Sequence, residues 1–484
     1  MTLPEDPQIP YLPHARGDRE AMLETIGVKT FDELITHIPK DLRIKALKMR
    51  EGLSEIELVK EIAELAAKNT PASQQHSFLG GGSYRRYVPS VVLQIISRSE
   101  FATAYTPYQP EVSQGSLQVI YEFQTAICLL TGMDVANASM YDGPTACAEA
   151  GLMAARLTNR KKLAILNSVN AEYRMVTHAY AKACGLDWNV IETKDGIVSP
   201  DALNLDADTA GIIVQYPNFF GCFEDMQAIS KKAKEAGAML IVVTDPIGLS
   251  IVTPPSELGA DIVVGDAQPC GNFLSFGGPS AGYMACKKEY VRQLPGRLAG
   301  MTVDKHGKPA FTLTLQTREQ HIRRARATSN ICTNQALNAL AMLVYLSVVG
   351  KNGLRKVAEI SLQRAHYLFD NVTKLPGVKP VFPHPFFNEF ALTFDVPVAS
   401  VFNKMQEKGY LPGINLNRIC PEMENAMLVA VTEMNSKEEL DSYVVALKEA
   451  LAEIAGGDHG TAQKENLRLK TENKKLATAG KEKS

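Results

Sequence analysis

The chain contains 484 residues, 45% of them hydrophobic, and carries a formal net charge of −2. This length and apolar content are enough for two or three domains with large cores, and the small net charge argues against a nucleic acid or an anionic membrane as the main partner. The eight cysteines form no Cys-x-x-Cys pair, so we expect reduced thiols rather than a disulfide framework or a zinc site.

A helical arm is predicted over residues 1–75. Its clearest helix follows Ser54, which can cap the first turn while Glu57 reaches back from three residues later. Apolar residues then repeat at helical spacing over residues 56–62. The extreme N-terminus holds acidic residues and prolines but no apolar core of the signal-peptide kind. We therefore expect a cytoplasmic protein.

A large α/β domain is predicted over residues 76–350. Short β-rich runs alternate here with helical patterns, at residues 162–166, 188–192, 211–216, 238–244, 261–264 and 282–286. The helix at 225–236 ends at Gly237, a residue that readily forms a left-handed cap. Strands that alternate with helices predict a doubly wound domain whose sheet is mostly parallel and covered on both faces.

A small α+β domain is predicted at residues 351–456. The apolar run at 336–350 precedes it and is shorter than the roughly 20 residues of a membrane span. We expect a buried helix there and no membrane contact. Strands are predicted near residues 386–394 and 427–432, and Ser436 is expected to open the last helix.

A charged tail occupies residues 457–484. The motif Glu-Asn-x-x-Leu recurs at Glu465 and Glu472, but two heptads are too few for a coiled coil. The tail has almost no aromatic residues, and it is predicted to be disordered or a frayed helix rather than a docking helix.

One residue type is missing from the middle of the large domain. Between Lys234 and Lys287 the chain contains no lysine, although one apolar strand there ends at Asp245 and the next is followed by Gln268 and Pro269. A strand-end aspartate suits the pyridinium nitrogen of pyridoxal phosphate, and a lysine after the following strand would form the Schiff base, which only an amine can do. The stretch has the layout of such a site without its reactive group.

Three segments resemble one protein family. They are GGGSYRRYVPSVV at residues 80–92, which runs on to the block EFATAYTPYQPEV…CAEAGLMAAR at residues 100–156, then GADIVVGDAQPCGNFLSFGGPSAGY at residues 259–283 and RRARATSNICTNQAL at residues 323–337. With the opening YLPH and the later FFNEFAL, they are similar to the N-terminal half, or α subunit, of the glycine cleavage system P-protein, which is glycine decarboxylase. The resemblance covers about residues 11–455.

The resemblance implies fold type I of the pyridoxal-phosphate-dependent transferases, with a large doubly wound domain and a small C-terminal α+β domain. It also implies a split enzyme, whose β subunit carries the cofactor lysine while the α subunit has the same fold without it. Pro269 falls near the lysine position. Two departures stand out: Arg86 and Tyr87 occupy the place of a usual histidine, and residues 265–268 read GDAQ instead of GEGQ.

Two residues are candidates for a vestigial cofactor site, and no covalent cofactor attachment is expected in this chain. Asp245 is interpreted as a pyridinium partner, a relic, or a turn residue before Pro246. Thr145, at the start of a helix with many small residues, is interpreted as a phosphate ligand or, more simply, as part of a helix cap. The Gly80–Gly82 string lacks the lysine of a phosphate loop, which favours a flexible turn.

Two polar segments are candidates for an active-site or interface contribution. The loop at 106–115 places hydroxyls, amides and an aromatic ring between two prolines, a poor composition for a core element. Residues 328–330 precede the long apolar helix and suit either an N-cap or a contact across an interface. The candidate residues are Thr106, Tyr108, Gln109, Ser113, Gln114, Thr328, Ser329 and Asn330.

The family resemblance implies an α subunit that is inactive alone and has no catalytic residue of its own, and the residue spacing leads us to expect no metal site. With a pyridoxal-phosphate-bearing β subunit, in an α2β2 assembly, it would decarboxylate glycine and pass the aminomethyl group to the lipoyl arm of the H-protein. One alternative is a self-sufficient enzyme that uses a displaced lysine, Lys287 or Lys288. Another is a non-catalytic binding module with a degenerate fold.

Overall fold

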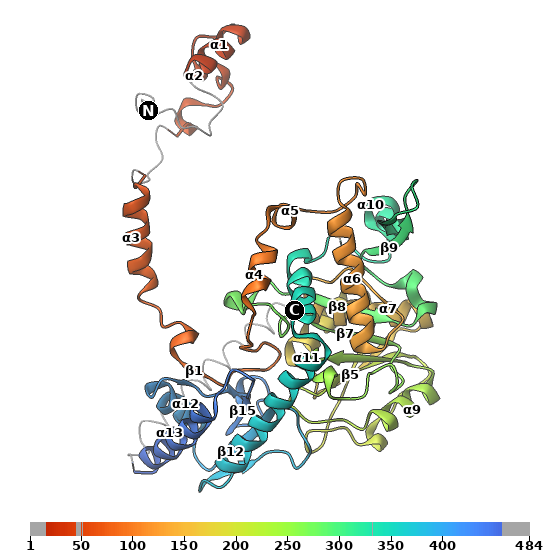
Figure 1. Ribbon diagram of the computed structural model, residues 1–484, viewed down its shortest axis with the longest axis vertical. Helices are drawn as coiled ribbons and strands as arrows, with labels where there is room; N and C mark the ends of the chain where they lie inside the picture. Colours follow the sequence, from red (N-terminus) through yellow and green to blue (C-terminus); the bar gives the residue numbers. More distant parts are fainter. Residues whose placement is uncertain (1–15, 45–49, 51, 332, 457–484) are drawn as a thin grey trace. The chain divides into compact units, whose positions relative to one another are not determined.

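The computed structural model describes residues 16–44, 50, 52–331 and 333–456 (Figure 1). The tail predicted at 457–484 lies outside these residues. The chain divides into two compact units, one up to Thr70 and one from Pro71.

The first unit is helical, as predicted. Its helices are α1 (Arg16–Ile26), α2 (Phe31–Leu34) and α3 (Glu55–Ala66). The predicted capping box of α3 is confirmed, because Ser54 Oγ accepts from the Glu57 backbone and the Glu57 carboxylate accepts from the Ser54 backbone at 2.9 Å. No residue of α3 is buried, so its apolar stripe has no partner within the described part of this unit.

The second unit contains the remaining helices and all the strands. The helices are α4 (Ser90–Ile96), α5 (Ser99–Ala102), α6 (Gln114–Thr131), α7 (Gly143–Thr158), α8 (Ala171–Ala183), α9 (Met226–Ala236), α10 (Gln320–Arg323), α11 (Ala336–Val372), α12 (Val398–Glu407) and α13 (Lys437–Gly456). The strands are β1 (His76–Ser77), β2 (Val135–Ala136), β3 (Lys162–Leu166), β4 (Asp187–Ile191), β5 (Thr209–Tyr216), β6 (Met239–Thr244), β7 (Ile262–Asp266), β8 (Gly282–Cys286), β9 (Leu298–Val303), β10 (Pro309–Thr314), β11 (Val378–Pro380), β12 (Glu389–Phe394), β13 (Tyr410–Leu411), β14 (Ile414–Asn415) and β15 (Ala426–Ala430).

A seven-stranded sheet with the order β2-β8-β7-β6-β5-β3-β4 forms the large domain. The pairs among β3, β4, β5, β6 and β7 are parallel, and β8 runs antiparallel to both β7 and β2. Every residue of β6 is buried, as expected for a parallel strand covered on both faces. The predicted doubly wound, mostly parallel sheet is confirmed, and the predicted helix that ends at Gly237 is α9, whose cap is left-handed.

The small domain is built on the antiparallel sheet β11-β12-β15-β14. Its own hydrophobic core includes residues of α12 and α13, such as Val401 and Leu447. The predicted cap of the last helix is present, since the Glu439 backbone donates to Ser436 Oγ at 3.2 Å. Strand β1 pairs with β13, so the residues that directly follow the predicted arm lie against this domain rather than against the large sheet.

Helix α11 connects the two domains (Figure 1). Of the described helices it is the one with the length and composition of a membrane span. Its first part places Met342 and Tyr345 in the core of the large domain, and its second part places Leu368 in the core of the small domain. The predicted helix is present, but it is only partly buried, since about a third (33%) of its most apolar window is buried. Gly350 interrupts it with φ 61°, a conformation that favours glycine.

Candidate functional site

Three elements of the large domain meet where its parallel strands end. Asp245 directly follows β6, Asp266 is the last residue of β7, and α7 begins nearby with Gly143. In open α/β sheets, ligands bind at the carboxyl ends of the strands, and helix starts attract anions. The carboxyl ends of these strands therefore form the candidate cofactor site.

Asp245 forms a turn. Its Oδ1 atom accepts hydrogen bonds from the backbone of Ile247 at 2.6 Å and of Gly248 at 3.1 Å. Its Oδ2 atom is buried and has no hydrogen-bond partner among the described residues. Asp245 therefore forms a turn, which is one of its three interpretations, and its Oδ2 atom stays available for another role.

The start of α7 is capped from within the chain. The Thr145 backbone donates to Asp142 Oδ1 at 2.8 Å, and the Thr145 hydroxyl in turn accepts from the Asp142 backbone at 3.2 Å. The Gly143 backbone donates to Asp266 Oδ2 at 2.9 Å. Thr145 thus belongs to a capping box, which confirms the simpler of its two interpretations.

Gln268 and Pro269, near the expected lysine position, are both buried. The Gln268 side chain binds both backbone groups of Tyr84: its Oε1 accepts from the Tyr84 N–H at 2.8 Å and its Nε2 donates to the Tyr84 carbonyl at 3.0 Å. Gln268 Nε2 also donates to the Asn272 carbonyl at 3.1 Å. The side chain at this position therefore holds a neighbouring segment in place.

Glu389 is a buried carboxylate that sequence reasoning missed. Its Oε2 accepts from the Tyr84 hydroxyl at 2.7 Å and its Oε1 from the Gly81 backbone at 2.6 Å. Burial raises the pKa of Glu389 to about 7, although both hydrogen bonds lower it. Gly81 and Gly82 have positive φ, so the predicted turn at 80–82 is present, and it is packed against Glu389.

Arg86 adds a positive charge to this region. Its side chain is 0% exposed, and Nη1 donates to Glu433 Oε2 at 2.7 Å and to Ser361 Oγ at 2.8 Å. Its Nε and Nη2 atoms are buried without a partner among the described residues. Burial lowers the pKa of Arg86, but the charges of Glu433 and Asp245 outweigh this and raise it.

The loop before α6 carries the second group of candidates. Tyr108 is 48% exposed, and its hydroxyl accepts from Arg297 Nη2 at 2.8 Å. The Arg297 guanidinium also lies 5.2 Å from the centre of the Tyr108 ring, a cation–π distance. Thr106 is half-buried and Gln109 is exposed. Tyr108 is thus held in one orientation at the surface.

Gln114 and Ser113 lie at the end of this loop. The Gln114 amide binds the backbone of Phe311 in both directions, at 2.8 and 2.9 Å, and also donates to the Pro110 carbonyl at 2.7 Å. Ser113 is half-buried and directly precedes α6. Gln114 therefore fastens the loop to β10.

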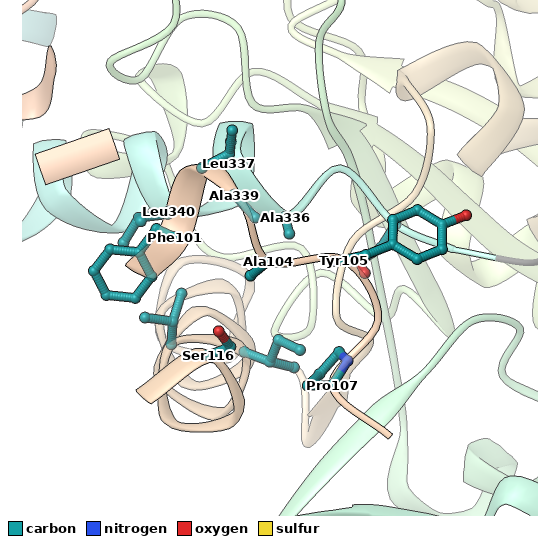
Figure 2. A pocket seen from close by; sticks show the side chains of 12 residues that line it. Phe101, Ala104, Tyr105, Pro107, Ser116, Ala336, Leu337, Ala339 and Leu340 are labelled. Atoms are coloured by element: carbon teal, nitrogen blue, oxygen red, sulfur yellow. The ribbon is translucent and has the colours of Figure 1, made fainter. Parts of the chain in front are cut away.

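A small cavity lies beside the loop (Figure 2). Its walls are mostly apolar and include Phe101, Pro107, Leu337 and Leu340, while Tyr105 points away from the other lining side chains. Its free volume of about 20 Å³ is room for about one water molecule. It is too small for a substrate or cofactor.

Residues 328–330 do not cap the long helix, because α11 begins at Ala336 after Gln335. The N-cap alternative is therefore wrong. The Ser329 hydroxyl donates to Glu149 Oε1 at 3.0 Å, and Asn330 is exposed. Burial raises the pKa of Glu149.

The structure brings the two candidate segments to one place. Thr328 and Ser329 line a small cavity together with Glu319. The Glu319 carboxylate lies 3.5 Å from Arg297 Nε, and Arg297 binds Tyr108. Sequence reasoning missed Arg297 and Glu319, because no motif or spacing connects them to the loop. Within the described residues, no group of three or more His, Cys, Asp or Glu side chains is arranged for a metal ion.

The chain is similar to known proteins over most of its length. A family model described as "Glycine cleavage system P-protein" matches residues 10–447. The probable glycine dehydrogenase (decarboxylating) subunit 1 of Anoxybacillus flavithermus is 50% identical over 440 residues, which cover 90% of this chain and 98% of that protein. Both similarities extend over nearly all of the described residues.

Solved structures give the same result for the fold. The crystal structure of glycine decarboxylase (P-protein) of the glycine cleavage system, in inhibitor-bound form, matches with a TM-score of 0.85 and 43% identity, covering 91% of this chain and 100% of that one. A sphingosine-1-phosphate lyase from Burkholderia pseudomallei matches with a TM-score of 0.61 at 16% identity, over 89% of this chain and 97% of that one, and supports the fold alone. The chain has the predicted fold of the pyridoxal-phosphate-dependent enzymes of type I.

Proposed function

Since the chain belongs to the glycine cleavage system P-protein family, we propose that it is the subunit of glycine dehydrogenase that lacks a cofactor lysine and works only with a second, lysine-bearing subunit. The enzyme is an oxidoreductase of the glycine cleavage system, and the relatives named subunit 1 imply a subunit 2. The observation that carries the proposal is the absence of any lysine between Lys234 and Lys287. Near the position expected for the cofactor lysine, the Gln268 side chain instead binds the backbone of Tyr84.

Pyridoxal phosphate, held by the partner subunit in this proposal, supplies the electron sink for the decarboxylation of glycine. The contribution of this chain is to bind and orient groups at the edge of the partner's site. Tyr108, Gln109 and Asn330 are exposed polar residues of the two candidate segments, and Tyr108 binds Arg297, whose Nε lies 3.5 Å from Glu319. Arg297 holds the Tyr108 hydroxyl and acts as a positioning residue.

The substrate, the acceptor protein and the assembly follow from the same assignment. Glycine is the substrate, the lipoyl arm of the H-protein accepts the aminomethyl group, and two copies of each subunit form a cytoplasmic α2β2 assembly.

The test is to purify this chain alone and together with its partner subunit, and to measure glycine-dependent exchange of carbon dioxide. We expect exchange only when both chains are present. Exchange by the single chain would contradict the proposal. A reduced pyridoxyl adduct on the single chain, identified by mass spectrometry after borohydride treatment, would contradict it as well.

A self-sufficient enzyme that uses Lys287 or Lys288 has unfavourable geometry. Strands β7 and β8 are antiparallel, with Asp266 opposite Gly282 and Ile262 opposite Cys286. Lys287 therefore follows β8 at the amino end of β7, and it pairs there with Asp261. Asp245 and Asp266 lie at the other edge of the sheet. A non-catalytic binding module remains the second candidate, and it predicts normal glycine turnover after deletion of the gene.

A further inference from the structure

We propose that this chain supplies from its own side chains the two charges that a bound pyridoxal phosphate would bring. The Asp266 carboxylate replaces the phosphate at the start of α7, and the Arg86 guanidinium replaces the pyridinium cation in front of Asp245. This inference rests on the proposed function, because it gives a reason beyond the missing lysine for placing the cofactor in the partner.

The phosphate end of the site is already occupied by carboxylates. A phosphate at a helix start needs the unpaired N–H groups of the first turn. In α7, the Gly143 N–H donates to Asp266 Oδ2 at 2.9 Å and the Thr145 N–H donates to Asp142 Oδ1 at 2.8 Å. Asp266 is held there by two further donors, the Gln268 N–H at 2.8 Å and the Ser280 hydroxyl. An incoming phosphate dianion would lie against this carboxylate.

The Tyr173 side chain packs directly against the start of α7. A Cβ atom added to Gly143 would lie 1.8 Å from the Tyr173 hydroxyl and 3.1 Å from Asp266 Cβ. Tyr173 is itself buried, with 8% of its surface exposed. Position 143 therefore accommodates only glycine in this packing.

The pyridinium end contains an internal cation. Asp245 Oδ2 and the Nε and Nη2 atoms of Arg86 are buried without partners among the described residues, and the two groups have opposite charge. The charge of Asp245 contributes to raising the pKa of Arg86. Glu433 and Ser361 accept from Nη1 and so hold the guanidinium in its buried position.

The segment that leads to Arg86 packs against the expected lysine position. Gln268 binds the Tyr84 backbone from both sides, and Glu389 binds the Tyr84 hydroxyl at 2.7 Å. Tyr84 and Arg86 are both buried. The residues present therefore do not fit pyridoxal phosphate, and restoring a lysine at position 269 alone is not expected to restore binding.

The first experiment opens the phosphate end in the full-length chain. Asp266→Ala frees the Gly143 N–H, and we expect the variant to bind inorganic phosphate, with a melting temperature about 1–3 °C higher at tenfold the dissociation constant. The wild type is expected to show no saturable response at the same ionic strength. Asp266→Ser is the second variant in case the alanine variant does not fold.

The matched control is Asp225→Ala. Asp225 also binds a first-turn N–H, that of Ala228 at 3.0 Å, but at the start of α9. A general salt effect would stabilise both variants equally, and an equal response would overturn the proposal. Saturable phosphate binding by the wild type would overturn it too.

The second experiment adds pyridoxal phosphate to the Pro269→Lys variant, after its folding has been checked by circular dichroism. We expect no visible absorbance to remain with the protein after dialysis. Retention of one cofactor per chain would overturn the proposal. Neither experiment measures glycine turnover, so a failure here leaves the subunit assignment to be decided by the carbon dioxide exchange assay.

Discussion

Arg86 holds a buried positive charge between the two domains, because its Nη1 lies 2.7 Å from Glu433 Oε2 and both side chains are at most 10% exposed. We predict that Arg86→Ala lowers the free energy of unfolding by about 3–5 kcal/mol, since it leaves the Glu433 charge buried and unpaired. Chemical denaturation of the full-length chain measures this loss.

The control for this prediction is Arg98→Ala. Arg98 also pairs with a glutamate, Glu100, at 2.8 Å, but both side chains are more than half exposed. Exposed pairs contribute about 0–1 kcal/mol. If both variants lose a similar, small amount of unfolding free energy, then burial does not strengthen the Arg86–Glu433 pair.

The buried Glu389 carboxylate is expected to make the free energy of unfolding depend on pH. Burial raises its pKa from 4.5 to about 7 in the folded chain. Between these values the folded chain keeps a proton that the unfolded chain releases, so the stabilisation is complete below pH 4.5 and is lost as the pH rises through about 7.

The variant that tests this is Glu389→Gln, which cannot titrate. We expect the stability of the wild type relative to the variant to fall by roughly 3 kcal/mol between pH 4.5 and pH 8. Urea denaturation at several pH values measures the difference. Parallel pH profiles for the two proteins would show that Glu389 ionises normally.

At the scale of elements, the turn at residues 80–82 is more tightly packed than its glycine composition indicates. A Cβ on Gly80 would lie 2.2 Å from Glu389 Oε1 and 2.4 Å from the Ala430 Cβ. We predict that Gly80→Ala costs about 1–3 kcal/mol, the usual cost of overpacking.

Gly115→Ala provides the comparison. Gly115 lies in α6, and a Cβ there would meet nothing within 4 Å. This substitution is expected to be neutral or to stabilise by up to about 1 kcal/mol, because alanine favours the helix. If both variants have the same melting temperature, the close approach at Gly80 is not a constraint.

The strands differ in how clearly the local sequence predicts them. Strands β3 and β8 begin and end at the predicted residues, because each is a short, continuous apolar run buried in the sheet. The hairpin of β9 and β10 was not predicted. Its outer residues are exposed or half-buried, so it has neither an apolar run nor a regular alternation to mark it.

For the whole molecule, the main prediction concerns the contact between the exposed Tyr108 and the buried Arg297. In the two-subunit enzyme, we expect Tyr108→Phe and Arg297→Lys to lower glycine-dependent carbon dioxide exchange about tenfold or more, because a misplaced group near a reacting centre can cost up to about a hundredfold. Exchange rates over a range of glycine concentrations separate kcat from KM.

The control tyrosine is Tyr367. Its hydroxyl also has a charged partner, Asp441 at 2.6 Å, but on the exposed side of the small domain. Tyr367→Phe is expected to keep full exchange. Gel filtration of each variant with the partner subunit shows whether assembly is retained, and unchanged exchange in an assembled Tyr108→Phe enzyme would contradict the positioning role.

The sequence alone determined the architecture and the missing reactive group. Buried parallel strands carry continuous apolar runs, and the presence or absence of an amine between Lys234 and Lys287 is a property of composition that needs no coordinates. Strand-end Asp245 and the helix start at Asp142 were also found in this way, since each follows from local chain signals.

Only the tertiary structure decided what fills the site. Tyr84 meets Gln268, Arg86 meets Glu433, and Gly143 meets Asp266 through contacts between residues more than 120 positions apart. The same holds for Tyr108 and Arg297, which are 189 positions apart. Local signals cannot reveal such pairs, because a buried charge is stabilised by whichever partner the fold brings to it, and that choice is made by packing and not by spacing along the chain.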